Sequence, residues 1–326
     1  MRPLRKAFAG VLFGALLLTG CGADGDTGAR AASPSPTASA GTFPVTVSAG
    51  NGAVTIPKRP ERVVSLSPTA TETLFAIGAG PQVVAVDDQS NHPPQAPKTD
   101  LSGFKPNAEA IIAQRPDLVV LSDDMDNIVA ELTKVKVPVL LEGSALKLDD
   151  AYDQITDLGA ATGNTAAAGK LAADVKGEIE RLAAAAPAST KKLTFYHEVD
   201  KSLFSTTSNT FIGQIYTLFG LENIADKAPD ASGGYPKLSA EFIADADPDL
   251  IFLADVKCCG QSAETVAKRP GWGDLTAVKN DSVIALDDDI ASRWGPRIVD
   301  LAKTLAAARE AALDKNADKA GAKAGS

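Results

Sequence analysis

Asn107 to Asp123 reads Asn-Ala-Glu-Ala-Ile-Ile-Ala-Gln-Arg-Pro-Asp-Leu-Val-Val-Leu-Ser-Asp, and Ser239 to Asp255 reads Ser-Ala-Glu-Phe-Ile-Ala-Asp-Ala-Asp-Pro-Asp-Leu-Ile-Phe-Leu-Ala-Asp. The two stretches align without a gap. In each, a good N-cap residue is followed by a glutamate in the first helical turn, and Pro-Asp separates the helix from an apolar strand. The chain therefore holds two copies of one helix-turn-strand unit, and this repeat predicts two lobes.

Each lobe is predicted to alternate strands with helices. In the first lobe the expected strands are 63–66, 83–86, 118–121 and 137–141, and the expected helices are 70–77, 108–114 and 128–135. In the second lobe the expected strands are 193–196, 250–253 and 283–286, and the expected helices are 211–219, 242–246, 263–268 and 297–308. Such alternation is typical of parallel sheets with helices on both faces, so the predicted fold class is α/β.

A single long helix is predicted between the lobes, over residues 164–186. Ala167, Leu171, Val175, Ile179 and Leu182 recur there at helical spacing, and Pro187 ends the pattern. At 1.5 Å per residue this helix is ~35 Å long, which is enough to run along both lobes. We interpret it as a stiff connector. The alternative is an ordinary surface helix of one larger domain.

The N-terminus has the pattern of a lipoprotein export signal. Residues 1–20 combine a basic start with an apolar run, and Leu18-Thr19-Gly20-Cys21 reads as a lipobox. The apolar run is too short to span a bilayer. Acyl chains on Cys21 would anchor the mature protein to the outer face of the cell membrane. A secreted protein with a chance cysteine is the alternative.

The predicted organisation has six parts: a signal peptide (1–20), a disordered tether (21–44), an N-terminal lobe (45–162), a connecting helix (163–187), a C-terminal lobe (188–313) and a flexible tail (314–326). The tether is rich in Ser, Pro, Ala and Gly and poor in large apolar residues, which disfavours a core. The tail lacks an apolar stripe. The part between tether and tail is long enough for two lobes of ordinary size.

The charge of the chain is acidic. Removal of residues 1–20 would leave 29 Lys and Arg against 41 Asp and Glu, a formal net charge of −12. This charge argues against nucleic acid as a partner. Acidity alone reports on solubility and says little about a ligand.

Ligands of parallel α/β sheets lie beyond the carboxyl ends of the strands, so the candidate ligand residues are those that follow each strand. In the first lobe we select Gln89 and His92, and in the second lobe His197, Tyr235, Arg293, Trp294 and Arg297. The two arginines flank an indole and Gly-Pro at the start of the last helix, an arrangement that suits anionic oxygens of a ligand. Equally, both arginines could pair with Asp287, Asp288 or Asp289 and close the loop.

Cys258 and Cys259 are the two cysteines that remain beside Cys21. In an exported protein they can form a vicinal disulfide or stay as free thiols. Adjacent cysteines lack the spacer of zinc sites, and only two histidines occur, so direct chelation of a bare ion is disfavoured. We find no P-loop, no G-x-S-x-G and no H-E-x-x-H pattern, so no catalytic set is assigned and the protein is predicted not to be an enzyme.

Taken in order, several segments resemble one family: the lipid-anchored or periplasmic substrate-binding proteins of ABC importers for ferric siderophores and vitamin B12. The matching segments are Arg62 to Glu72, His92-Pro93-Pro94, the two copies of the repeat, and Gly295-Pro296-Arg297-Ile298. The resemblance implies two Rossmann-like lobes joined by a rigid helix. It also implies a monomer that binds a small metal chelate and works with a permease dimer and its ATPase.

In that family a glutamate on each lobe docks onto the permease, and the matching positions here are Glu109 and Glu241. Corrinoid binders use several aromatic residues in the cleft, whereas this chain offers chiefly Tyr196, Tyr235 and Trp294. Siderophore binders favour arginine and tyrosine, so the resemblance slightly favours a ferric siderophore. No resident cofactor is expected, because the ligand itself carries iron or cobalt. A binding protein for bare Zn²⁺ or Mn²⁺ and an envelope enzyme are the alternatives.

Overall fold

The computed structural model describes residues 41–186, 189 and 191–324, and all of them lie in one structural unit, Ala38–Ser326. The predicted signal peptide, Cys21 and nearly all of the predicted tether lie outside the described residues. Among the described helices, none is long and apolar enough to cross a membrane. The folded part contains two parallel sheets of four strands and one two-stranded hairpin.

The first sheet has the strand order β4-β3-β5-β6. Its strands are β3 (Val63–Leu66), β4 (Val83–Val86), β5 (Leu118–Leu121) and β6 (Val139–Leu141), and the helices of this lobe are α1 (Pro68–Ala76), α2 (Ala108–Ala113) and α3 (Ile128–Lys134). All neighbouring strands are parallel. The strands consist almost entirely of buried β-branched and leucine residues, as expected for a sheet covered on both faces.

The second sheet repeats this arrangement with the order β8-β7-β9-β10. Its strands are β7 (Thr194–Glu198), β8 (Glu222–Asn223), β9 (Leu250–Leu253) and β10 (Val283–Ala285). The helices are α6 (Phe211–Leu218), α7 (Ala240–Ala246), α8 (Val256–Cys259), α9 (Ala263–Ala267), α10 (Thr276–Lys279), α11 (Asp288–Ala291) and α12 (Ile298–Ala324). The α/β class with two parallel-sheet lobes is therefore confirmed.

The sequence repeat corresponds to α2-β5 in one lobe and α7-β9 in the other, and both strands occupy the same place in their sheets. The repeated Pro-Asp also has one structural role. Asp117 accepts hydrogen bonds from the backbone N–H groups of Glu61 and Arg62, just before β3, and Asp249 accepts one from Thr194 at the start of β7. Each aspartate thus fixes the start of the neighbouring central strand.

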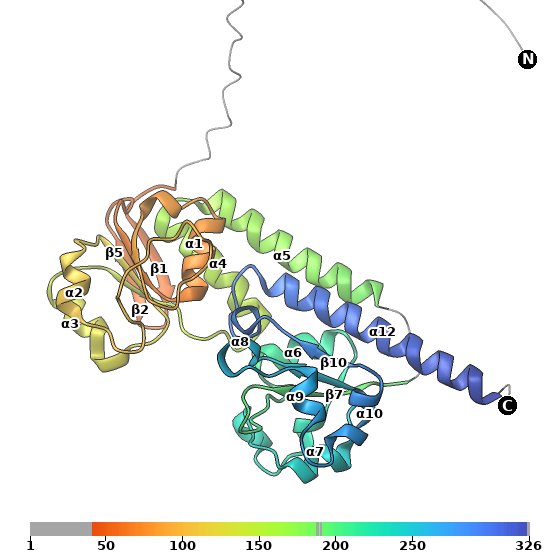
Figure 1. Ribbon diagram of the computed structural model, residues 1–326. Helices are drawn as coiled ribbons and strands as arrows, with labels where there is room; N and C mark the ends of the chain where they lie inside the picture. The colour runs from red at the N-terminus through yellow and green to blue at the C-terminus, as the bar shows by residue number, and fades with distance from the viewer. Residues whose placement is uncertain (1–40, 187–188, 190, 325–326) are drawn as a thin grey trace, which may run out of the picture. The chain divides into compact units, whose positions relative to one another are not determined.

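The predicted connector is α5 (Thr165–Ala185). Ala168 and Ala172 of α5 belong to the core of the first lobe, whereas Val175 and Ile179 belong to the core of the second lobe. One helix therefore contributes to both cores, in agreement with the connector interpretation. Figure 1 shows α12 lying beside α5.

Several elements differ from the prediction. The short elements β8, α8, α10 and α11 of the second lobe were not expected. The hairpin of β1 (Val45–Ala49) and β2 (Gly52–Ile56) was not expected, and its turn is tied to β6 by a bond from Gly50 N–H to the Leu141 carbonyl. Helix α4 (Leu148–Thr162) was also not expected. A Cβ on Gly159 would clash with Ala168, so this glycine lets α4 pack tightly on α5.

The tail predicted to fray from residue 314 is instead a continuation of α12, which extends to Ala324. Alanine and lysine dominate this segment, and both have high helix propensity, so a helix that is already nucleated by packing can propagate through it. The prediction of a flexible tail rested only on the missing apolar stripe. It was wrong, because the backbone of residues 314–324 is helical.

Candidate functional site

A cleft of about 380 Å³ lies at the carboxyl ends of the first sheet. Its first-lobe side is formed by the end of β3 and by residues that follow β3, β4, β5 and β6, and its second-lobe side by α11 and the segment after it. The lining residues are Leu66, Ser67, Pro68, Thr69, Asp87, Gln89, Gly103, Phe104, Ser122, Asp123, Met125, Ser144, Asp289, Ser292, Arg293 and Trp294. The strand-end rule therefore points to an edge of the sheet where a cleft is present. Of the predicted ligand residues, Gln89, Arg293 and Trp294 line it.

Helix α11 positions the second-lobe side of this cleft. The Asp287 side chain caps the helix by accepting hydrogen bonds from the N–H groups of Asp289 and Ile290. The contact with Lys257, whose Nζ lies 2.8 Å from Asp287, helps to hold the pKa of Asp287 below its usual range against the opposing effect of burial. Capping fixes the start of the helix, and Arg293 and Trp294 follow directly after its end.

The two arginines pair with Glu72 of α1, a residue that the sequence analysis did not single out. Arg297 donates from Nε to Glu72 Oε2 at 2.8 Å, and Arg293 donates from Nη1 to Glu72 Oε1 at 2.8 Å. The Glu72 side chain is only 2 % exposed. Of the predicted aspartate partners, Asp289 contacts Arg293, at 2.8 Å. The arginines therefore join the two lobes through a buried carboxylate, beyond closing their own loop.

Trp294 lines the cleft and is held by a hydrogen bond to the first lobe. Its indole Nε1 donates to Gln154 Oε1 of α4 at 2.7 Å. A second, small cavity of about 10 Å³ is lined in part by Glu142, Gln154 and Trp294, and its volume is close to that of one water molecule. Glu142 Oε1 is buried and has no hydrogen-bond partner within the described part of the chain. Burial, together with repulsion from Asp157, raises the pKa of Glu142 to about 8.

A polar network supports the first-lobe side of the cleft. Asp87 accepts a hydrogen bond from the Ser90 hydroxyl, which in turn contacts the Thr71 hydroxyl at 2.9 Å. Thr71 also donates to Ser65. Asp87 is 3 % exposed, and this burial raises the pKa of its carboxyl group although the bond from Ser90 opposes the shift.

Two other predicted ligand residues, Tyr196 and His197, lie in the interior of the second lobe and do not line the cleft. They are 0 % and 1 % exposed, and His197 Nδ1 forms a 2.8 Å hydrogen bond with the Tyr216 hydroxyl. Burial lowers the pKa of His197 to about 4 and raises the pKa of Tyr196 well above its ordinary value. Strand β7 extends two residues beyond its predicted end, and this extension carries His197 inward.

Tyr235, His92 and Arg297 are not among the residues that line the cleft. Tyr235 is 52 % exposed, and partial burial raises the pKa of its hydroxyl. His92 is half-buried, between Asn91 and a cis peptide bond to Pro93. Among the described residues, no group of three or more His, Cys, Asp or Glu side chains is arranged to hold a metal ion.

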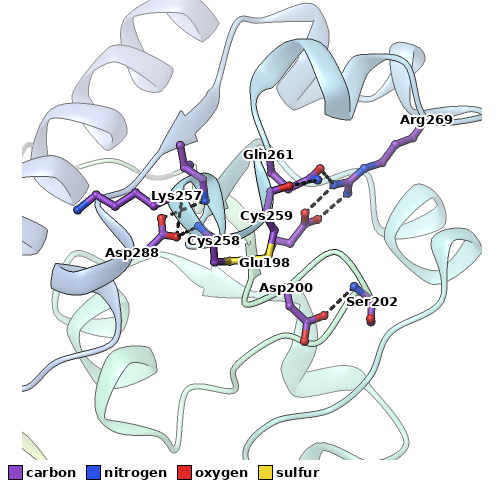
Figure 2. Close-up of a disulfide and its surroundings, with 10 residues drawn as sticks. Glu198, Asp200, Ser202, Lys257, Cys258, Cys259, Gln261, Arg269 and Asp288 are labelled. Atoms are coloured by element: carbon purple, nitrogen blue, oxygen red, sulfur yellow. Dashed lines mark hydrogen bonds and ion pairs between the residues drawn. A yellow bond between two sulfur atoms is a disulfide. The ribbon is translucent and has the colours of Figure 1, made fainter. Parts of the chain in front are cut away.

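Cys258 and Cys259 are joined by a disulfide in helix α8, directly after β9 (Figure 2). Asp288 of α11 accepts hydrogen bonds from the backbone N–H groups of Val256, Lys257 and Cys258, at 2.9–3.0 Å. This carboxylate lies at the N-terminus of α8 and ties the disulfide-bearing turn to the helix that forms one side of the cleft.

A buried charged cluster in the second lobe, formed by Arg269, Glu198 and Asp255, was not recognised from the sequence. Arg269 contacts Glu198 through two charge-assisted hydrogen bonds, at 2.5 and 2.6 Å, and its guanidinium lies 4.6 Å from the centre of the Trp272 ring. Asp255 is fully buried, and burial followed by the nearby Glu198 raises its pKa to about 7. The repeat could have drawn attention to Asp255, because this residue aligns with Asp123 at the end of the equivalent strand. Asp123 is exposed, whereas Asp255 is buried.

Glu109 and Glu241 occupy equivalent, exposed positions in the first turns of α2 and α7. The predicted caps are present. Asn107 accepts from the Ala110 N–H at 2.9 Å, and Ser239 accepts from the Phe242 N–H at 3.1 Å. Both carboxylates are therefore presented to solvent on rigid helix starts.

Comparisons with known proteins address the family directly. The chain matches the periplasmic binding protein family over residues 63–290. It is 29 % identical over 316 residues to an uncharacterized ABC transporter substrate-binding lipoprotein, YvrC, of Bacillus subtilis, covering 94 % of this chain and 97 % of the relative. A cobalamin-binding protein of Halobacterium salinarum is 31 % identical over 268 residues, which is 79 % of this chain and 72 % of that protein.

Among solved structures, a possible iron-binding (periplasmic solute-binding) protein from Staphylococcus epidermidis is similar, with a TM-score of 0.66 and 26 % identity. The similarity covers 78 % of this chain and 99 % of that chain. The resemblance stated from the sequence is thus confirmed at the level of the family. The chain belongs to the periplasmic binding protein family.

Proposed function

We propose that this protein captures a metal chelate in the cleft between β3–β6 and the α11–α12 segment and delivers it to an ABC importer. The observation that carries this proposal is the cleft itself, which lies at the strand ends of one lobe and is closed by Arg293 and Trp294 of the other. Family membership supports binding for transport and no catalytic activity.

The chelate is proposed to carry iron or cobalt, so that the metal arrives with the ligand and no resident cofactor is needed. One relative is named for cobalamin and one structural neighbour for iron. The sequence-based preference for a ferric siderophore rested on Arg293, Arg297 and Tyr235. The first two pair with Glu72, and Tyr235 does not line the cleft, so that preference loses its support.

The protein is proposed to act outside the cytoplasm, anchored through acyl chains on Cys21. The name of the B. subtilis relative includes the word lipoprotein, which agrees with the lipobox at Leu18-Thr19-Gly20-Cys21. The partner is proposed to be a permease dimer with its ATPase, and the binding protein itself to be a monomer. Exposed Glu109 and Glu241, one on each lobe, are the proposed docking contacts.

Tryptophan fluorescence tests the proposed function, because the chain has two tryptophans in opposite environments. Trp294 lines the cleft, whereas Trp272 is 1 % exposed in the core of the second lobe. We expect saturable quenching by cobalamin or by a ferric chelate in the wild type and in Trp272→Phe, and loss of most of the quenching in Trp294→Phe. Saturable binding of Zn²⁺ or Mn²⁺ alone, with no response to any chelate, would favour the bare-metal alternative instead.

A further inference from the structure

The cleft has an unequal set of charged side chains. Three carboxylates line it, from Asp87, Asp123 and Asp289, whereas the guanidinium of Arg293 is the single cationic group among the lining residues. A ligand that enters the cleft therefore meets more negative than positive charge. Arg293 could attract an anionic group of the ligand only if its guanidinium were free to contact that group.

Arg293 is already engaged by the protein. Its Nη1 donates to Glu72 at 2.8 Å and to the Asn91 side chain at 3.0 Å, and its Nη2 donates to the Gln89 carbonyl at 3.0 Å and to Asp289 at 2.8 Å. All four Nη–H groups thus have acceptors, and the side chain is only 10 % exposed. A ligand carboxylate would have to displace a buried protein carboxylate to form a bidentate contact.

The neighbouring cations are held in the same way. Arg297 donates from Nε and Nη2 to the two oxygens of Glu72. Lys257 lies 2.8 Å from Asp287 and 3.0 Å from Asp289. The positive charges of this segment are therefore neutralised within the protein before any ligand binds.

Within the described part of the chain, two of the lining carboxylates have no cationic partner of this kind. Asp123 is exposed, and Asp87 is buried with a serine hydroxyl as its hydrogen-bond donor. The remaining polar residues of the lining are uncharged: Ser67, Thr69, Gln89, Ser122, Ser144 and Ser292. Hydroxyl and amide groups of this kind can donate to neutral carbonyl oxygens, and Phe104, which is 71 % exposed, adds an apolar face.

We propose that the cleft selects metal chelates whose rim is uncharged or cationic, such as amide-rimmed corrinoids or ferric hydroxamates, and disfavours chelates that present carboxylate or catecholate oxygens. This inference rests on the proposed function and specifies the chemical class of its ligand. Glu72 contributes to this preference, because it engages Arg293, the single cationic residue of the lining.

Two matched pairs of probes test the inference with the wild-type protein. The first pair is cyanocobalamin and its monocarboxylic acids, obtained by hydrolysis of single side-chain amides. The second pair is ferrioxamine B, a cationic ferric hydroxamate, and a ferric tris-catecholate. In whichever pair binds, we expect the uncharged or cationic member to bind at least about tenfold more tightly at low salt, and the ratio to shrink as added salt screens the charges.

The outcomes distinguish a failure of the ligand-class inference from a failure of the proposed function. Equal or tighter binding of the carboxylate or catecholate member overturns the inference and leaves the proposed function intact. No binding by any of the four chelates overturns both. A preference within the corrinoid pair alone identifies the ligand as a corrinoid, and a preference within the iron pair alone identifies it as a ferric hydroxamate.

Reversing the charge of one lining residue tests whether the preference for uncharged or cationic chelates arises from the carboxylates of the cleft. Asp123→Lys replaces an exposed lining carboxylate, and Glu131→Lys makes the same change on the exposed surface of α3, outside the lining. We expect Asp123→Lys to reduce the ratio within the binding pair roughly fivefold, an effect of the size typical of one exposed charge pair, and Glu131→Lys to leave it unchanged. An equal effect of both variants, or no effect of Asp123→Lys, would overturn the assignment to cleft charge.

Discussion

Glu72 of the first lobe accepts hydrogen bonds from Arg297 of the second lobe on both carboxylate oxygens, although the two residues are 225 positions apart. The Glu72 side chain is 2 % exposed and the Arg297 side chain 21 % exposed. Contact with Glu72 raises the pKa of Arg297. Charge-assisted, bidentate contacts of this kind are the strong ones, so this pair holds the lobes together at the edge of the cleft.

Replacement of Glu72 should therefore destabilise the protein. Glu72→Ala leaves Arg293 and Arg297 largely buried without their shared carboxylate, and removal of one partner of a buried pair typically costs about 3–5 kcal/mol. Chemical denaturation measures this change in the free energy of unfolding. Glu131→Ala, on the exposed face of α3, is the matched control. A Glu72→Ala variant as stable as the control would show that the ion pairs contribute nothing net.

Much of the fold could be predicted from the sequence because its signals are local. The repeat 107–123 and 239–255 fixed the equivalent elements of the two lobes, and buried strands such as Val63–Leu66 and Leu118–Leu121 coincide with their predicted bounds. Helix α4 was missed although Ala151, Ile155 and Leu158 recur at helical spacing and Gly163, with φ of 76°, ends it.

The site was less predictable, because its contacts are not local. Nothing near Arg293 or Arg297 in the sequence indicates Glu72 as their partner, which lies in the first helix of the other lobe. His197 lies in the interior because β7 continues to Glu198, two residues beyond its predicted end, and the ends of elements are poorly marked by composition alone.

Glu142 should make stability fall as the pH rises. Burial raises its pKa from the ordinary 4.5 to about 8, so the folded state binds this proton more tightly than the unfolded state. The stabilising contribution of the protonated group is complete below pH 4.5 and is lost as the pH rises toward 8, with a slope of up to about 1.4 kcal/mol per pH unit. Glu142→Gln should flatten this part of the pH–stability profile, whereas Glu131→Gln should not. An unchanged profile in Glu142→Gln would contradict the buried, protonated state.

His197 should make the free energy of unfolding fall as the pH falls, which is the opposite of the trend expected for Glu142. Its pKa is lowered from 6.5 to about 4 by complete burial, so the folded state disfavours the imidazolium. The contribution of the neutral form is present above pH 6.5 and is lost as the pH falls toward 4. His197→Gln should therefore reduce the dependence of the free energy of unfolding on pH between 6.5 and 4, measured by denaturant titration. An unchanged slope in His197→Gln would contradict the buried, neutral state of His197.

The vicinal disulfide should contribute little to global stability. A bond between Cys258 and Cys259 links neighbouring residues, so it closes almost no loop and removes little conformational freedom from the unfolded chain. The double variant Cys258→Ser and Cys259→Ser should melt within about 2 °C of the wild type. Labelling of free thiols before and after reduction verifies that the wild-type bond is formed. A much larger drop in melting temperature would indicate that α8 and its contacts with Asp288 depend on the bond.

Glu109 and Glu241 should matter for transport and not for ligand binding. Both are exposed in the first turns of equivalent helices whose caps, Asn107 and Ser239, do not depend on them. Neither glutamate lines the cleft. Glu109→Ala and Glu241→Ala should therefore leave chelate affinity and the melting curve nearly unchanged, while uptake and stimulation of the transporter ATPase fall, and the double variant should be more defective than either single one.

In the proposed docking, two equivalent lobes meet a two-fold symmetric permease, so the same contact is used twice, and contacts between exposed charges are weakened by salt. The loss of ATPase stimulation should thus resemble the effect of raising ionic strength on the wild type. Glu131→Ala, an exposed glutamate of the first lobe outside the repeat, is the matched control. Full transport by a stably folded double variant would leave Glu109 and Glu241 with only the role that their position in the first turn gives them, as partners of the helix dipole.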